Sequence, residues 1–249
     1  MPLKPSDNPI GVAEETSDTQ IKLTYASPPP ENNGSAIVSY ELQMDDGFTG
    51  DFFTLIGYVT NSKLTTFTIT TNIFKGRQHR FKYRAKNDVG WGPFSDETAV
   101  LAAREPNTPG RVTFLSFAND ELNLAIVIPA DNGGSAIEFI ELWSDEGDDF
   151  TSEFHQLTNY DGVGTTYAAT QADDSLEPGK TYRFKTRAKN LIGYSEFSVE
   201  AYIAFGNVPN RPDAPTRIAS TTTSITVQWT APLANELSTS GYILNMDDG

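Results

Sequence analysis

The feature that most constrains this chain is an internal repeat of about 100 residues. A repeat of that length is too long for the units of a solenoid and fits one small domain per copy. The sequence therefore predicts tandem domains and not one large core. The matching segments are Gly34–Ile37 with Gly134–Ile137, Asp45–Gly47 with Asp145–Gly147 and Asp247–Gly249, and Arg80–Asn87 with Arg183–Asn190.

Two proline-rich segments separate the repeats, at residues 104–110 (REPNTPG) and 207–215 (NVPNRPDAP). Proline restricts the backbone, so we expect short, semi-rigid linkers. The predicted domains are 1–103, 104–206 and 207–249. The third holds only the N-terminal part of a domain, which is completed either by continuing chain or by another subunit; continuing chain is the preferred interpretation.

Apolar residues alternate with polar residues inside each repeat, as in Ile21, Leu23 and Tyr25. A period of two is typical of strands with one buried face. Short strands punctuated by Asp-Gly, Asn-Gly and Pro-Gly turns indicate an all-β sandwich. The residues predicted to lie in the cores are Tyr25, Ile126, Leu176, Tyr182 and Trp229.

Two motifs stand out within the repeats. An aromatic residue with proline three positions later occurs as Trp229 with Pro232 and as Tyr25 with Pro28, and Ile126 with Pro129 keeps the spacing. The Leu-x-Pro-Gly-x-x-Tyr corner runs from Leu176 to Tyr182. Both motifs resemble the fibronectin type III family. The resemblance implies tandem immunoglobulin-like, seven-stranded β-sandwiches, two complete and one truncated.

The first repeat departs from the family corner, because His79 stands where the second repeat has Tyr182. The resemblance implies that the corner ring packs in the core while its polar atom bonds nearby backbone. His79 can pack in the same way, but its hydrogen bond is left open. The Asp-Asp-Gly turn followed by Gly-Asp-Phe is similar to long tandem arrays of this family in ciliate proteins.

The formal net charge is −15, and the chain has no cysteine. An acidic surface repels nucleic acid and anionic lipid, so neither is an expected partner. The lack of cysteine excludes disulfides and thiolate metal sites in this segment. No apolar run approaches the roughly 20 residues that span a bilayer, so no membrane insertion is expected here.

Acidic residues cluster at a predicted hairpin turn of each complete repeat. Grouped carboxylates are the hard oxygen ligands that calcium binds. The spacing is not that of an EF-hand, and Asp-Gly also suits a plain tight turn, which is the preferred interpretation. No other cofactor is predicted. The calcium candidates are Asp45, Asp46, Asp51, Asp145, Glu146, Asp148 and Asp149.

A basic stripe follows one face of a predicted strand in each repeat. One interpretation is a binding surface for a polyanion or an acidic partner, which includes the acidic turns of another chain. The other, which we prefer, is cross-strand pairing with residues such as Glu41 and Glu141. The stripe consists of Arg80, Lys82, Arg84 and Lys86 in the first repeat and Arg183, Lys185, Arg187 and Lys189 in the second.

Aromatic residues at positions predicted to face outward are the remaining interaction candidates. Trp91 and Tyr194 lie in the loop before the last strand, and Phe139 and Trp143 have outward parity on a strand. Aromatic residues are typical interface anchors, although a linker or neighbouring domain covering them is an equal alternative. Asn33 begins an Asn-Gly-Ser sequon and is the glycosylation candidate.

Recognisable catalytic motifs are absent from the sequence: the two histidines fit no nucleophile–base pattern, and there is no glycine-rich phosphate loop. We therefore expect a non-catalytic structural or adhesive array that binds protein, including copies of itself, and assembles into filaments. The expected location is extracellular or at the cell surface. The alternatives are a ligand-binding receptor ectodomain and an intracellular or ciliary scaffold spacer.

Overall fold

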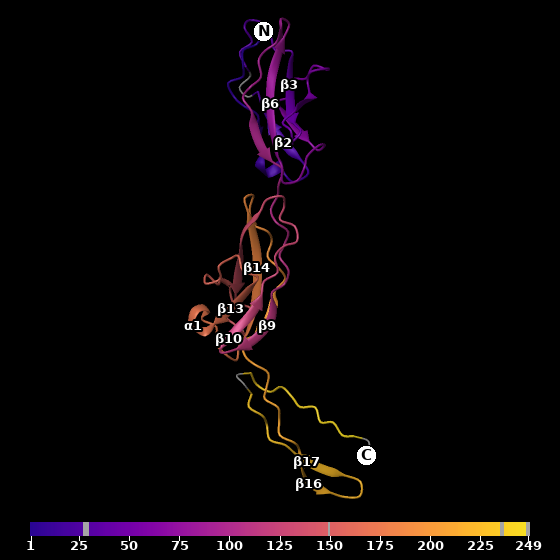
Figure 1. Cartoon of the computed structure of the whole chain (residues 1–249), viewed down its shortest axis with the longest axis vertical. Helices are drawn as coiled ribbons and strands as arrows, with labels where there is room; N and C mark the ends of the chain where they lie inside the picture. The colour runs from indigo at the N-terminus through magenta and orange to yellow at the C-terminus, as the bar shows by residue number, and fades with distance from the viewer. Residues whose placement is uncertain (27–29, 149, 235–236, 248–249) are drawn as a thin grey trace. The chain divides into compact units, whose positions relative to one another are not determined.

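The computed structural model of the chain describes residues 1–26, 30–148, 150–234 and 237–247. Nearly all of its regular secondary structure is β (Figure 1), which confirms the predicted fold class. The helical elements of the described residues are the 3-10 turn η1 (Ala13–Glu15) and the short helix α1 (Gln171–Asp174). Residues 1–107, 130–138 and 189–195 make up one compact unit, and residues 108–129, 139–188 and 196–249 make up the other.

The first repeat forms two antiparallel sheets (Figure 1). One sheet has the order β1-β2-β5, and the other has the order β4-β3-β6-β7 with β8 also paired to β6. The short strand β7 is additional to the seven that the family resemblance implies. The strands are β1 (Ile10–Gly11), β2 (Ile21–Thr24), β3 (Ser39–Asp45), β4 (Phe52–Ile56), β5 (Thr66–Ile69), β6 (Gln78–Asn87), β7 (Gly90–Trp91) and β8 (Thr98–Leu101).

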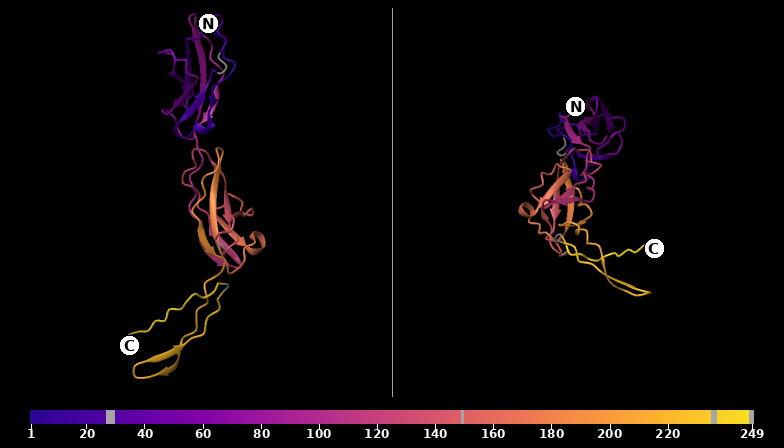
Figure 2. Two further views of the ribbon diagram at one scale, coloured as in Figure 1. Left: turned by 180° about the vertical axis from the view of Figure 1, so that it is seen from behind. Right: turned by 60° about the horizontal axis from the view of Figure 1, so that its bottom comes forward.

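The second repeat has the same two-sheet plan, seen from two further sides in Figure 2. Its sheets have the orders β13-β10-β9 and β12-β11-β14-β15. The strand β9 is therefore an edge of the first of these sheets. The strands are β9 (Thr113–Ala118), β10 (Glu121–Ala125), β11 (Ile137–Ser144), β12 (His155–Gln156), β13 (Thr166–Thr170), β14 (Thr181–Asn190) and β15 (Ala201–Ala204).

Alternation along the strands places one side chain of every two in a core. In β6 each residue from His79 to Asn87 is alternately buried and half-buried. Burying an aromatic or branched side chain contributes roughly 1.5–3 kcal/mol to stability. Four of the predicted core residues are at most 3 % exposed, namely Tyr25, Ile126, Leu176 and Tyr182.

Trp229 differs from that expectation, because its side chain is 40 % exposed. It follows the two-stranded sheet of β16 (Thr216–Ser220) and β17 (Ile225–Gln228). No second layer of strands faces this hairpin among the described residues (Figures 1 and 2). Without a facing sheet an alternating pattern cannot bury its apolar side chains, so Trp229 stays partly exposed, with its ring centroid 5.7 Å from that of Tyr242.

Candidate functional site

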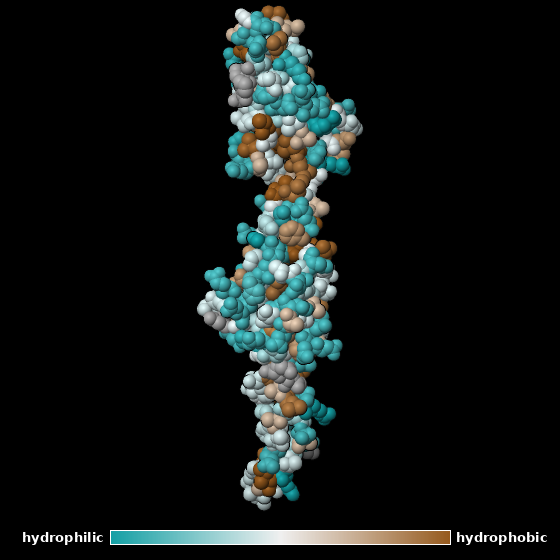
Figure 3. All heavy atoms as spheres, turned by 90° about the vertical axis from the view of Figure 1, so that its left-hand side faces the viewer, coloured by the Kyte–Doolittle hydropathy of each residue, from teal (hydrophilic) through white to brown (hydrophobic). Residues whose placement is uncertain are grey.

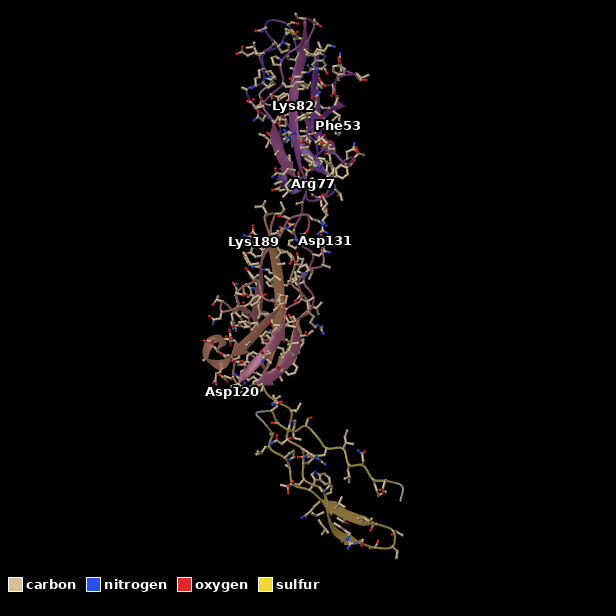
Figure 4. All side chains as sticks on the ribbon, viewed as in Figure 1. Phe53, Arg77, Lys82, Asp120, Asp131 and Lys189 are labelled. Carbon is tan, nitrogen blue, oxygen red and sulfur yellow. The ribbon has the colours of Figure 1, made fainter. Side chains whose placement is uncertain are left out.

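The basic stripe lies on β6 and β14, the longest strands of their repeats. The residues between the stripe positions, such as Phe81, Tyr83 and Phe184, are fully buried, so the stripe lies on the opposite face. This confirms the predicted parity. Figure 4 labels Lys82 on β6 and Lys189 near the end of β14.

An aspartate binds the first arginine of each stripe through two hydrogen bonds. The Asp45 carboxylate accepts hydrogen bonds from the Arg80 backbone amide at 2.9 Å and from Arg80 Nε at 2.9 Å. Asp145 accepts the same pair from Arg183, at 2.9 and 2.7 Å. The second pair is more deeply buried: the Arg183 side chain is 10 % exposed, against 42 % for Arg80.

The third residue of each stripe pairs with glutamate on the neighbouring strand, as the sequence predicts. Arg84 Nε lies 2.6 Å from Glu41, which is its direct register partner on β3. Arg187 Nε lies 2.7 Å from Glu141. Both glutamates are nearly buried, at 1 % and 6 % exposure. Each hydrogen-bonded pair is therefore a stronger interaction than an ordinary ion pair at the surface.

Aromatic rings alternate with the cations of the first repeat. Lys82 Nζ lies 3.6 Å from the centroid of the Phe52 ring and 5.1 Å from that of Phe94. The Arg84 guanidinium lies 4.4 Å from the Phe94 centroid and 4.9 Å from that of Trp91. Cations at these distances over ring faces are attracted by the ring quadrupole. We call this alternation of cations and rings the cation–aromatic ladder.

The second repeat builds the same ladder from equivalent residues. Lys185 Nζ lies 3.7 Å from the Phe154 centroid and 4.4 Å from the Phe197 centroid, and Arg187 lies 4.9 Å from the Phe197 centroid. Burial lowers the pKa of Lys185. Among the described residues neither Lys82 nor Lys185 has an acidic partner within salt-bridge distance, so rings provide their main charge contacts.

Three of the four aromatic interaction candidates contact cations of the stripe. Trp91 stacks on Tyr58 and under Arg84, and Trp143 packs edge-on against Phe197 while its Nε1 donates to Glu141. Tyr194 lies 5.6 Å from Lys189 and is 40 % exposed. Phe139 is half-buried. Trp91 and Trp143 are therefore partly covered by their own repeats.

Most of the calcium candidates bind neighbouring groups. Asp45 and Asp145 bind arginine and backbone amides, and Asp46 accepts the amides of Phe48, Thr49 and Gly50. Hydrogen bonds from Thr49 and Phe48 hold the pKa of the Asp46 carboxyl well below its usual range. The described residues contain no group of three or more metal-binding side chains in position to hold an ion. Asp149 lies outside the described residues, and calcium stays a prediction.

The remaining calcium candidates contribute to the same two turns. Asp51 accepts a hydrogen bond from the Thr49 hydroxyl at 3.0 Å, and Asp148 accepts one from the Thr181 amide at 2.8 Å. The backbone amide of Glu146 donates to the Ser152 hydroxyl at 3.3 Å. These contacts are those of structured acidic hairpin turns.

The corner position joins these turns to the cores. Tyr182 Oη accepts the Glu177 amide at 2.6 Å, and in the first repeat His79 Nε2 accepts the Phe74 amide at 3.2 Å. Histidine therefore fills the tyrosine's role. A Cβ on Gly47 or on Gly147 would lie 2.8 Å from the corner ring, and both glycines have positive φ, so only glycine fits there.

Four charged residues of the first unit form a closed ring of alternating sign. Lys75 contacts Asp18 and Asp131, and Arg104 contacts the same two carboxylates at 3.2 and 3.0 Å. Arg104 also donates its backbone amide to the carbonyl of Gly133. The segment around Arg104, predicted as a linker, is thus held by charge as well as by proline.

The ring of charges predicts that the Asp131 carboxyl titrates at a lower pH than an ordinary aspartate. The hydrogen bond from Lys75 lowers the pKa of this carboxyl below the ordinary value of 3.8. A carboxyl with a lowered folded-state pKa stabilises the fold above its unfolded value, and that stability is lost as pH falls through the folded value. Carbon-detected NMR titration should place the Asp131 midpoint below 3.8 in the wild type and closer to it in Lys75→Met. An unshifted midpoint would contradict the ring.

The sequence alone did not identify the four phenylalanines whose side chains contact the cations of the stripe. They are Phe52, Phe94, Phe154 and Phe197. A signal was present, because Phe94 and Phe197 each precede a serine, Ser95 or Ser198, at equivalent positions of the two repeats. Recurrence at equivalent positions beside a basic strand, and not aromatic character alone, would have found them.

Comparison with known proteins gives the family. No family model matches the chain. "Fibronectin type-III domain-containing protein 3A" from Mus musculus is 28 % identical over 95 % of the chain and 20 % of its own length. The Gallus gallus "Fibronectin type-III domain-containing protein 3a" is 30 % identical over 96 % of the chain and 18 % of its own length. "Protein sidekick-1" from Gallus gallus is 26 % identical over 91 % of the chain and 10 % of its own length. The chain thus spans a fifth or less of these relatives.

Among solved structures, the FN1–FN3 domains of chicken CNTN1 align with 97 % of the chain and 77 % of their own, at 17 % identity and a TM-score of 0.41. The family assignment rests on the sequence relatives, the paired sandwiches and the corner motif of Tyr182. Taken together, these observations identify the chain as a tandem fibronectin type III protein.

Proposed function

We propose that this chain is a non-catalytic structural or adhesive array within a longer protein and that it acts through protein–protein contacts. One observation carries the proposal: the aspartate-bound arginine and the cation–aromatic ladder recur at equivalent positions of both repeats. A feature that recurs at equivalent positions of both repeats serves each sandwich as structure. It leaves the charged residues of the stripe engaged with neighbours and not arranged around a substrate.

The fibronectin type III relatives support the same class of function, and their greater length supports further modules in the whole protein. In the described part of the chain, no helix has the length and apolarity to cross a membrane. We place the array at the cell surface or outside the cell, where the exposed Asn33 of the sequon would be open to glycosylation. A ciliary or intracellular scaffold is the alternative location.

A second candidate function is ligand binding by a receptor ectodomain. Val89 and Ile192 lie at equivalent positions of the loop before the last strand and are 70 % and 42 % exposed. The exposed tip at Val89 favours contact with another molecule at that end of the first repeat, whereas Ile192 also lines a hollow with Pro9 and Ile10. The candidate differs from the array in needing a ligand other than a copy of the same chain.

Electron microscopy of the native assembly, with an antibody label on this segment, tests the proposal. An array should appear as beads repeated along a filament or along a cell-surface layer. A label found only on isolated receptors would favour the second function. A label found only inside an enzyme complex, without regular spacing, would contradict the proposal.

A further inference from the structure

The edge strand β9 lacks the charged residues and prolines that often keep sheet edges apart. It is the outer strand of its sheet and pairs only with β10 among the described residues. Its six residues, TFLSFA, include no charge and no proline. Natural edge strands are normally protected by lysine, proline or a cover, because unpaired N–H and C=O groups bind a further strand.

The exposed side chains of β9 are apolar. Phe114 and Leu115 are 51 % and 52 % exposed, and Leu115 is the extra residue of a β-bulge between the registers of Phe114 and Ser116. A hollow of about 740 Å³ runs beside the strand, lined also by Tyr202 and Val208 and by residues 237–241. The edge thus combines free backbone groups with an apolar flank.

The charges at the two ends of β9 indicate a second copy as the occupant. Arg111 precedes the strand and Asp120 follows it, both exposed, and among the described residues neither forms an ion pair. If two copies pair antiparallel about a two-fold axis centred between Leu115 and Ser116, Arg111 of each copy meets Asp120 of the other. The same register pairs Phe114 with Phe117. Figure 4 labels Asp120 at the end of this sheet.

The charge of the whole chain favours this edge over other surfaces. At a net charge of −15, two copies repel each other in general. Most of the face shown in Figure 3 is hydrophilic or neutral, with hydrophobic residues in separate groups. An uncharged strand flanked by one cation and one anion removes the repulsion locally and adds two symmetric attractions.

We infer that β9 is a homotypic docking strand through which two copies of this chain join their sheets edge to edge. This rests on the proposed function and specifies its contact. Pairing extends over Thr113–Phe114 and Phe117–Ala118, on either side of the bulge. Hydrogen bonds of the two backbones provide the contact, and the flanking charges set its register.

Sedimentation velocity over a concentration series of the full chain tests the inference. We expect a monomer–dimer equilibrium in the wild type. Arg111→Glu and Asp120→Lys should each weaken the dimer on the order of tenfold, because each reversal replaces two attractions by two repulsions. The double reversal should restore the dimer. Lys63→Glu, an exposed site far from β9 in the sequence, is the control for net charge and should leave the constant unchanged.

Leu115→Lys places a charge in the strand itself and should abolish the dimer while leaving urea unfolding of the monomer unchanged. A wild type that stays monomeric at all concentrations, because residues 237–241 or nothing occupies the edge, overturns the inference. So does a double reversal that fails to restore pairing. Neither result affects the micrograph test of the array, which any other contact between chains would also satisfy.

Discussion

Replacing Asp145 with alanine should lower the free energy of unfolding of the second sandwich by roughly 3 kcal/mol. The carboxylate is fully buried and holds the Arg183 guanidinium and backbone amide, with a third bond from Gly147. Removing it leaves two backbone donors unpaired and takes the nearest carboxylate from a nearly buried cation, which keeps the Ser152 carbonyl and Glu200 at 3.7 Å. Urea unfolding followed by the fluorescence of Trp143 measures the loss.

Asp45→Ala is the matched variant in the first repeat, followed by Trp91. It removes the same three bonds, but the Arg80 side chain is 42 % exposed and water can solvate it. We expect a clearly smaller loss there, with Asp145→Asn between wild type and alanine in the second repeat. Equal losses for Asp45→Ala and Asp145→Ala would show that burial of the pair does not set its contribution.

Truncating the corner tyrosine should have an effect of similar size. Tyr182→Ala should cost about 3–5 kcal/mol, because the side chain is 1 % exposed and packs against Phe184 and Gly147. Tyr182→Phe removes only the hydroxyl that accepts the Glu177 amide and should cost about 1–3 kcal/mol, the penalty of a donor left unpaired.

Thermal and urea unfolding of the two variants separate packing from hydrogen bonding. His79→Phe is the control in the first repeat, where it removes the acceptor of the Phe74 amide and keeps a ring. We expect a loss of the same order as for Tyr182→Phe. A neutral Tyr182→Phe would mean that the corner acts through packing alone.

Much of the fold was predictable because its signals are local and doubled. Alternation in Ile21–Tyr25 and Arg80–Asn87 fixes strands and their buried faces, and the repeat shows that the same plan occurs twice. Trp229 shows the limit, since alternation states which side chains would be buried but not whether a facing sheet is present to bury them.

The site was predictable only in part. Pairing of Arg84 with Glu41 followed from strand order, because direct neighbours on antiparallel strands lie close together. The role of Asp45 did not follow, since its bond to Arg80 spans 35 residues and depends on a turn that returns the carboxylate to β6. The rings over Lys82 come from a different strand and from a loop, which residue spacing alone does not bring together.

The central claim is that the cations of the basic stripe are in contact with aromatic rings of their own repeat. Protons above a ring face experience an upfield ring-current shift, so NMR of the lysine ε-methylene groups tests the claim directly. The ε-protons of Lys82 and Lys185 should lie upfield of ordinary lysines and return to normal positions in Phe52→Leu and Phe154→Leu, respectively. Ordinary shifts for both lysines in the wild type would contradict the ladder, and with it the structural role given to the stripe.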